Sequence, residues 1–97
     1  MSEKRLDWCG MGIDFILGEE KNLPFRVRSL TGQSVVITDA VFKLMSNGEV
    51  IQEGKCDIDG QMIYCLIKPT EIGCMYIEIE YVIAPETRKA RFNINVT

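Results

Sequence analysis

The sequence predicts an all-β fold, a Greek-key β-sandwich of about seven antiparallel strands. Three observations support this prediction. Apolar and polar residues alternate with a period of two along much of the chain, turn-favouring residues recur roughly every 8–12 residues, and no stretch of ten residues has the three-and-four apolar spacing of a helix. Because successive strand side chains point to opposite faces of a sheet, each such segment can bury one face against a second sheet.

The expected strands follow from this alternation and from the residues that interrupt it. A loop of charged and turn-favouring residues that begins at Gly18 ends the first strand. Pro24 opens the second, because the start of a strand tolerates its missing N–H. In chain order, the expected strands are residues 12–17, 24–30, 34–39 leading directly into 40–45, 50–55, 61–68, 75–83 and 90–97.

Two short turns predict hairpins between neighbouring strands. Asn47-Gly48 lies between two strand-like runs, and both residues tolerate the positive φ of a type I′ turn. A second hairpin signal is the Asp59-Gly60 pair. Gly54, near the end of the strand between these turns, is expected to mark a bulge or a bend.

The C-terminal third gives the clearest pattern. Residues 75–83 have apolar side chains at the odd positions, and Glu78 and Glu80 are among the even ones. A turn-like segment at residues 85–89 follows, and the alternation resumes over residues 90–97. These two runs predict an antiparallel hairpin with one buried face.

Length and composition indicate a single domain that covers residues 1–97. With 97 residues, 46% of them apolar and 26% charged, the chain has the size and composition of an ordinary globular domain with its own core. Residues 1–11 are expected to form a poorly structured or capping N-terminal segment. They are charged and lack the apolar stretch of a secretion signal, and no apolar run approaches the roughly 20 residues that span a bilayer. We therefore expect neither a secretion signal nor membrane insertion.

The charge of the chain argues against nucleic acid as a partner. The net charge is −3, and the basic residues occur in small scattered groups. Sequence-independent binding of nucleic acid needs clustered cations that neutralise several phosphates. Arg26 and Arg28 alternate with apolar residues, so they are expected to point outward into solvent.

The chain has four cysteines, Cys9, Cys56, Cys65 and Cys74. Zinc sites usually bring thiolates in close pairs such as Cys-x2-Cys, and the sequence contains no such pair. Cys65 shares a strand face with Ile63 and Ile67, which favours a small buried hydrophobe. A disulfide and a metal site are the less favoured alternatives, since disulfides belong mainly to exported proteins.

The chemistry of common active sites is missing from the sequence. The chain has no histidine, which removes the commonest general base and metal ligand. Asp57, Asp59 and Gly60 suggest part of a calcium loop, but the other oxygen ligands and the flanking helices of an EF-hand are absent. Glu78 and Glu80 would lie about 7 Å apart on one strand face, where solvated glutamates are far commoner than a catalytic pair. We therefore expect no enzyme activity, no catalytic residue, no cofactor and no metal.

Exposed aromatic and acidic side chains are the candidate interaction surface, which consists of Trp8, Tyr76, Glu78 and Glu80. Tyr76 shares a face with the two glutamates and could stack on a sugar ring, although cross-strand packing is the commoner role of an aromatic on a sheet. Trp8 could cap an open end of the sandwich or dock on another subunit. The expected partners are proteins, either copies of this chain or other proteins, and carbohydrate is the alternative.

The number of strands and the turn spacing fit an immunoglobulin-like topology, without the cysteine and tryptophan pattern of antibody domains. Residues 13–27 (IDFILGEEKNLPFRV) and 31–42 (TGQSVVITDAVF) resemble the opening of small immunoglobulin-like modules in bacteriophage tail and baseplate proteins. The shared features are a strand, a Gly-acid loop, a second strand and a short apolar Thr-Asp-Ala entry to the third.

This resemblance implies a non-enzymatic structural or interaction module of phage or prophage origin, with a role in virion assembly or host-surface contact. Its partners would be other virion proteins or further copies of the chain. It would reside in the bacterial cytoplasm before assembly and in the virion afterwards. Unpaired edge strands would offer main-chain hydrogen bonds to a neighbouring copy. The alternative is an accessory domain that binds carbohydrate or another surface.

Overall fold

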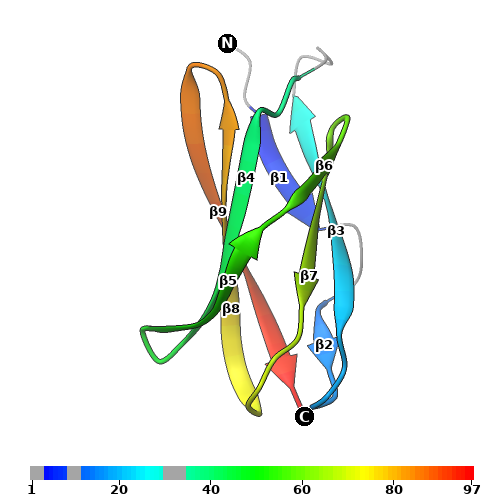
Figure 1. Ribbon diagram of the computed structural model, residues 1–97, viewed down its shortest axis with the longest axis vertical. Helices are drawn as coiled ribbons and strands as arrows, with labels where there is room; N and C mark the ends of the chain where they lie inside the picture. Colours follow the sequence, from blue (N-terminus) through cyan, green and yellow to red (C-terminus); the bar gives the residue numbers. More distant parts are fainter. Residues whose placement is uncertain (1–3, 9–11, 30–34) are drawn as a thin grey trace.

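The computed structural model describes residues 4–8, 12–29 and 35–97, which form two packed β-sheets (Figure 1). These residues form nine strands: β1 (Lys4–Trp8), β2 (Asp14–Phe15), β3 (Lys21–Ser29), β4 (Asp39–Ser46), β5 (Glu49–Lys55), β6 (Asp57–Asp59), β7 (Met62–Ile67), β8 (Gly73–Ile83) and β9 (Glu86–Val96). The four-stranded sheet has the order β1-β3-β7-β6, and the five-stranded sheet has the order β2-β9-β8-β4-β5. The predicted all-β sandwich is confirmed.

The strand order is that of an immunoglobulin-like sandwich. The first sheet corresponds to strands A, B, E and D of such domains, and β9, β8 and β4 correspond to G, F and C. All described neighbours are antiparallel except β2, which runs parallel to the end of β9. Among the described strands the chain changes sheet between β1 and β2, β2 and β3, β3 and β4, β5 and β6, and β7 and β8. Cys56 is the single residue between β5 and β6.

One hydrophobic core fills the space between the sheets. In β8 the odd-numbered residues from Met75 to Ile83 are buried and alternate with more exposed ones, as their sequence pattern predicts. Phe25 of β3 and Phe92 of β9 connect the two sheets, with ring centroids 4.7 Å apart. The largest fully buried side chains are those of Tyr81, Phe15, Phe25, Leu44, Ile63, Ile67, Ile77, Ile79, Val27 and Cys65.

Both hairpins predicted from short turns are present. Asn47 and Gly48 join β4 to β5 with φ angles of 52° and 80°, the positive values that a type I′ turn requires. In the β6–β7 hairpin the two loop residues are Gly60 and Gln61, one position later than the predicted pair. Gly60 has a φ of 60°, which fits the first position of a type II′ turn.

The N-terminal segment differs from its expected form. Residues 1–11 were expected to be poorly structured or capping, whereas Lys4–Trp8 form β1 at the edge of the four-stranded sheet. Arg5 and Asp7 alternate with Leu6 and Trp8 in this strand, but the run is short and three of its five residues are charged. Charged residues are common on edge strands because they discourage edge-to-edge aggregation. The predicted strand at residues 12–17 is reduced to Asp14–Phe15. It ends there because the Glu19 N–H donates to the Ile16 carbonyl at 2.9 Å and closes a turn.

The predicted strand at residues 34–39 is wrong for the described residues 35–38, which join no sheet ladder. Their burial still alternates: Val35 and Ile37 are buried, whereas Val36 is 73% exposed. One main-chain hydrogen bond, from the Thr38 N–H to the Val82 carbonyl at 3.0 Å, holds the end of the segment beside β8. The segment therefore covers the core without a strand partner, and β4 begins only at Asp39.

Gly54 does not mark the irregularity in β5. The register shifts between Leu44 and Met45 of β4, so the extra residue on β5 is Ile51. Gly54 instead lies opposite Phe42, and a Cβ atom there would be 3.2 Å from Phe42 Cε1. The glycine thus makes room for an aromatic ring, and a shallow hollow of about 310 Å³ opens beside it on β4 and β5.

Candidate functional site

Three of the four predicted interaction residues lie together on the outer face of the five-stranded sheet. Tyr76, Glu78 and Glu80 occupy alternate positions of β8, and each is half-buried. The register sets them beside Asn93, Arg91 and Lys89 of β9, respectively. On their other side they adjoin Met45, Lys43 and Val41 of β4.

Trp8 belongs to a different part of the molecule. Its main chain ends β1 in the four-stranded sheet, opposite Phe25 of β3. Its side chain lies outside the described part of the structure. Tyr76, Glu78 and Glu80 therefore share one face, and the main chain of Trp8 is in the other sheet.

The two glutamates are paired with cations across the β8–β9 hairpin. Arg91 Nε donates to Glu78 Oε2 at 2.9 Å. Lys89 Nζ lies 4.0 Å from Glu78 Oε1 and 3.7 Å from Glu80 Oε2, so it bridges both carboxylates. The hydrogen bond to Glu78, together with the charge of that carboxylate, raises the pKa of Arg91. This face is a ladder of compensated charges and not a free acidic patch.

We expect Glu78→Gln to lower the midpoint of urea denaturation only slightly. Arg91 and Lys89 are largely exposed, so water replaces the lost carboxylate at little cost. The difference from the wild type should shrink as sodium chloride is added, because salt screens exposed pairs. Glu71→Gln is the matched control, since no ion pair of this loop glutamate is found among the described residues. A large, salt-independent loss of stability would contradict the expectation.

The ring of Tyr76 already has a charged neighbour. The guanidinium carbon of Arg91 lies 5.2 Å from the ring centroid, which is within the range of a cation–π contact. Arg91 therefore contacts both Glu78 and the face of Tyr76. A sugar ring would have to use the other face of the tyrosine or displace the guanidinium.

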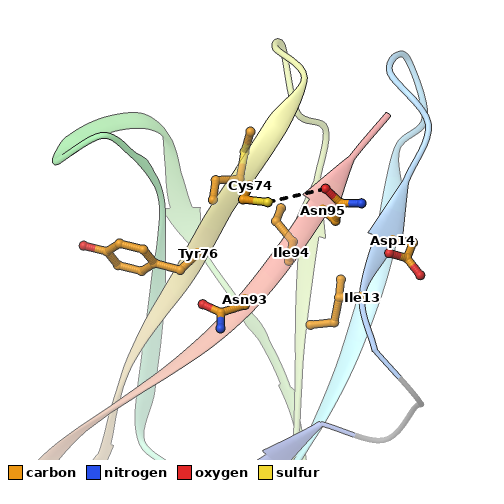
Figure 2. A pocket seen from close by; sticks show the side chains of 8 residues that line it. Ile13, Asp14, Cys74, Tyr76, Asn93, Ile94 and Asn95 are labelled. Carbon is orange, nitrogen blue, oxygen red and sulfur yellow. Dashed lines mark hydrogen bonds between the residues drawn. The ribbon is translucent and has the colours of Figure 1, made fainter.

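A shallow hollow of about 500 Å³ lies at the junction of β2, β9 and β8 (Figure 2). Its polar side chains come from Asp14, Cys74, Tyr76, Asn93 and Asn95. The Cys74 thiol lies 3.6 Å from Asn95 Oδ1 and donates to it. Figure 2 shows the Tyr76 ring extending away from Asp14 and Asn95, so the aromatic ring and these polar groups do not converge on one point. The outward alternation of β9 was the sequence signal for Asn93 and Asn95, but their hollow depends on the position of β2.

The described residues offer no metal centre. No group of three or more histidine, cysteine, aspartate or glutamate side chains gathers among them. Cys65 is completely buried, as predicted, Cys56 is half-buried and Cys74 is exposed, and all three are free thiols. Cys9 lies outside the described residues. Within the described part of the chain, no helix is long and apolar enough to cross a membrane.

The β9 strand is only partly covered along its outer edge. β2 pairs with it at Asn95 and Val96 alone, so no described strand continues the sheet beside residues 86–92. Burial follows this difference: Ile94 and Val96 are each 2% exposed, whereas Ala90 and Phe92 are only half-buried although they point toward the core. The sheet is thus incomplete at this edge among the described residues.

The main-chain groups at this edge have a definite direction. The N–H groups of Asn95 and Thr97 donate to the carbonyls of Ile13 and Phe15 at 3.0 and 2.9 Å, so they point away from β8. N–H directions alternate along a strand, and those of Thr87, Lys89 and Arg91 therefore point the same way. No described main-chain acceptor pairs with these three groups, which leaves a template for an added strand.

The sequence matches no protein-family model and no curated protein. Solved structures match the fold. The endo-β-1,4-mannanase of Thermotoga petrophila superposes with a TM-score of 0.68 at 9% identity, over 98% of this chain and 20% of the enzyme. The CARDB domain of the PF1109 protein of Pyrococcus furiosus, solved with di-metal ions, gives 0.56 at 15% identity over 99% of this chain and 89% of that chain. A chimeric titin Z1Z2 gives 0.52 at 15% identity over 98% of both chains.

The titin match agrees with the strand order. The chain has an immunoglobulin-like fold. Identities of 9–15% establish the fold alone. The immunoglobulin-like chain spans about a fifth of the length of the mannanase it matches. None of the three proteins is described as a phage tail or baseplate protein.

Proposed function

We propose that this immunoglobulin-like chain is a non-enzymatic protein-interaction module and that the uncovered edge of β9 is its binding element. The observation that carries the proposal is the half-buried pair Ala90 and Phe92 beside outward N–H groups that have no main-chain partner among the described residues. An extended segment added there would gain main-chain hydrogen bonds and would cover both apolar side chains. This mode of recognition is β-strand addition to a sheet edge.

The side chains at this edge favour a different protein over a second copy of β9. Arg88, Lys89 and Arg91 of β9 already pair with glutamates of this chain, and a second copy of β9 would set further cations opposite them, which is unfavourable. A partner strand with apolar residues facing Ala90 and Phe92 and acidic residues on the outer face fits better. Specificity would come from these alternating side chains and affinity from the main chain.

The class of partner that we propose is a virion protein, with the module in the bacterial cytoplasm before assembly and in the virion afterwards. Support for this finer part comes from the sequence resemblance of residues 13–27 and 31–42 to phage tail and baseplate modules. The geometry of the β9 edge does not depend on this resemblance. Failure of the virion assignment would therefore leave the edge proposal in place.

The edge can be tested with a short peptide in which valine alternates with glutamate. We expect the peptide to slow hydrogen exchange of the Thr87, Lys89 and Arg91 amides, because it would accept their hydrogen bonds. Lys89→Pro removes one outward N–H and should weaken binding roughly tenfold or more. Proline is tolerated where a strand N–H faces away from its sheet, so the fold should persist.

Two further variants distinguish the contribution of the main-chain N–H groups from that of the Lys89 side chain. Lys89→Ala keeps the N–H and should bind nearly as well as the wild type. Ala90→Pro removes an N–H that points toward β8 and should destabilise the fold itself. A peptide that binds without protecting any β9 amide, or that binds Lys89→Pro and the wild type equally, would overturn the proposal.

A second candidate function is carbohydrate binding at the hollow beside Tyr76. Its support is the carboxylate of Asp14 and the carboxamides of Asn93 and Asn95, which can hydrogen-bond sugar hydroxyls. One fold neighbour, the mannanase, acts on a polysaccharide. Titration with a β-1,4-linked manno-oligosaccharide should then release heat that Tyr76→Ala abolishes and Tyr64→Ala, on the other sheet, does not. No heat at millimolar sugar would exclude this candidate for that sugar class.

A further inference from the structure

Two cysteines meet at the point where the chain passes from one sheet to the other. The Sγ atoms of Cys56 and Cys65 lie 3.0 Å apart, in hydrogen-bonding contact. Cys65 is on β7 and completely buried, whereas Cys56 is half-buried between β5 and β6. Both thiols are free, and no other atom fits between them.

The main-chain register brings these residues face to face. Asp57 pairs with Tyr64 in the antiparallel β6–β7 hairpin, so the next residues outward are Cys56 and Cys65. Residues directly opposite in such a pair have Cα atoms about 4.5–5.5 Å apart. Disulfides span Cα separations of about 4.4–6.8 Å. The register and the 3.0 Å contact between the Sγ atoms are therefore compatible with the spacing that a disulfide requires.

Cys56 lies where the chain crosses from the five-stranded sheet to the four-stranded sheet. Its N–H donates to the Ala40 carbonyl at 2.9 Å, which attaches it to β4 in the five-stranded sheet. The next residue, Asp57, begins β6 in the four-stranded sheet. All three β6 residues are exposed, so this short edge strand has little apolar burial to hold it.

We propose that Cys56 and Cys65 form a redox modification site, in which a small-molecule or protein disulfide oxidises the two thiols to an intramolecular cross-strand disulfide. The oxidant's S–S bond breaks and the Cys56–Cys65 S–S bond forms. Two S–H bonds are lost, and the two protons and two electrons pass to the oxidant, which leaves as two thiols. The bond fastens the β5–β6 crossing to β7 in the first sheet.

The different exposure of the two thiols sets the order of the steps. Cys56 is reachable from solvent, so its thiolate attacks the oxidant disulfide and forms a mixed disulfide with release of the first thiol. Cys65 then gives up its proton and attacks Cys56 Sγ, which releases the second thiol. The hydrogen bond with Cys56 and then burial raise the pKa of the Cys65 thiol, which makes it a poor first nucleophile.

The test uses the full chain with Cys9→Ser and Cys74→Ser, which leaves only the proposed pair. Incubation with oxidised glutathione should give a monomer that has lost the mass of two hydrogen atoms. The loss should lie in the single tryptic peptide from Cys56 to Arg88, which contains both cysteines, because trypsin does not cleave the Lys68-Pro69 bond. Closing this short loop should raise the melting temperature by roughly 10 °C, and dithiothreitol should reverse the shift.

Cys56→Ser in the same background is the matched control, because it removes the more exposed partner and leaves the buried Cys65 in place. We expect it to show neither the mass loss nor the shift in melting temperature. If both thiols of the parent remain open to alkylation after oxidation and unfolding, the proposal is wrong. Disulfides that form only between molecules, or a stable adduct of glutathione on Cys56, would also overturn it.

Discussion

Ile77→Asp is expected to leave the purified chain unfolded at room temperature. Ile77 is completely buried in β8, the middle strand of the five-stranded sheet. The substitution leaves a cavity and places an unpaired carboxylate among apolar side chains, which together cost several kcal/mol. A domain of this size has a total stability of only about 5–15 kcal/mol. Far-ultraviolet circular dichroism and the dispersion of amide resonances would show the loss of the sheets.

The neighbouring residue provides the control for this prediction. Tyr76→Asp places the same carboxylate on the outer face of the same strand, beside Arg91. There the charge stays solvated and gains a cationic neighbour, so the variant should remain folded. If Ile77→Asp keeps dispersed amide resonances and a urea midpoint close to that of Tyr76→Asp, the two faces of β8 have been assigned wrongly.

The sequence pattern was sufficient for strands that bury one face. The alternation over residues 75–83 and 90–97 predicted which side chains of β8 and the end of β9 lie in the core. Asn47-Gly48 predicted a hairpin because few residue pairs accept positive φ at both loop positions. In these cases the information is local, within the strand or the turn itself.

Strands that depend on distant partners could not be predicted in the same way. β1 carries three charges in five residues, and it is a strand because its main chain pairs with β3. The reverse holds for residues 35–38, which alternate like a strand but find no ladder among the described residues. Periodicity reports burial of one face, whereas a strand also requires a neighbour with free main-chain groups.

The candidate site was predicted in part. Tyr76, Glu78 and Glu80 share one face, as their spacing indicated. Their compensation by cations was missed because the turn was expected at residues 85–89, which would have left Lys89 in a loop. The actual loop consists of Ala84 and Pro85, joined by a cis peptide bond, so β9 begins at Glu86. That shorter loop sets Lys89 opposite Glu80 and Arg91 opposite Glu78.

The uncovered edge of β9 also could not be predicted from the sequence. The pattern showed that Ala90 and Phe92 point inward, but their partial exposure goes with the pairing of β2 to Asn95 and Val96 alone among the described residues. The turn at residues 16–19, where Glu19 Oε1 accepts the Ile16 N–H at 2.6 Å, ends β2 on the side of Val96, away from residues 86–92. The coverage of β9 therefore depends on the pairing of segments far apart in the sequence, which only the fold relates.

Phe25→Ala should lower the free energy of unfolding by about 3–5 kcal/mol, because the side chain is completely buried and its loss leaves a cavity between the sheets. Phe92→Ala should cost less, since its ring is only half-buried at the β9 edge. The rings touch across the sandwich, so a double-mutant cycle from urea denaturation should give a coupling of about 0.5–1.5 kcal/mol.

The same cycle connects the core to the proposed binding edge. A peptide added beside β9 would cover Phe92 from its exposed side and press it onto Phe25. Saturating peptide should therefore raise the urea midpoint of the wild type more than that of Phe92→Ala, with Tyr64→Ala on the other sheet behaving like the wild type. If the losses in free energy of unfolding for Phe25→Ala and Phe92→Ala simply add in the double variant, the two rings do not join the sheets. If the peptide raises the urea midpoint equally in the wild type, Phe92→Ala and Tyr64→Ala, Phe92 lies outside the bound surface.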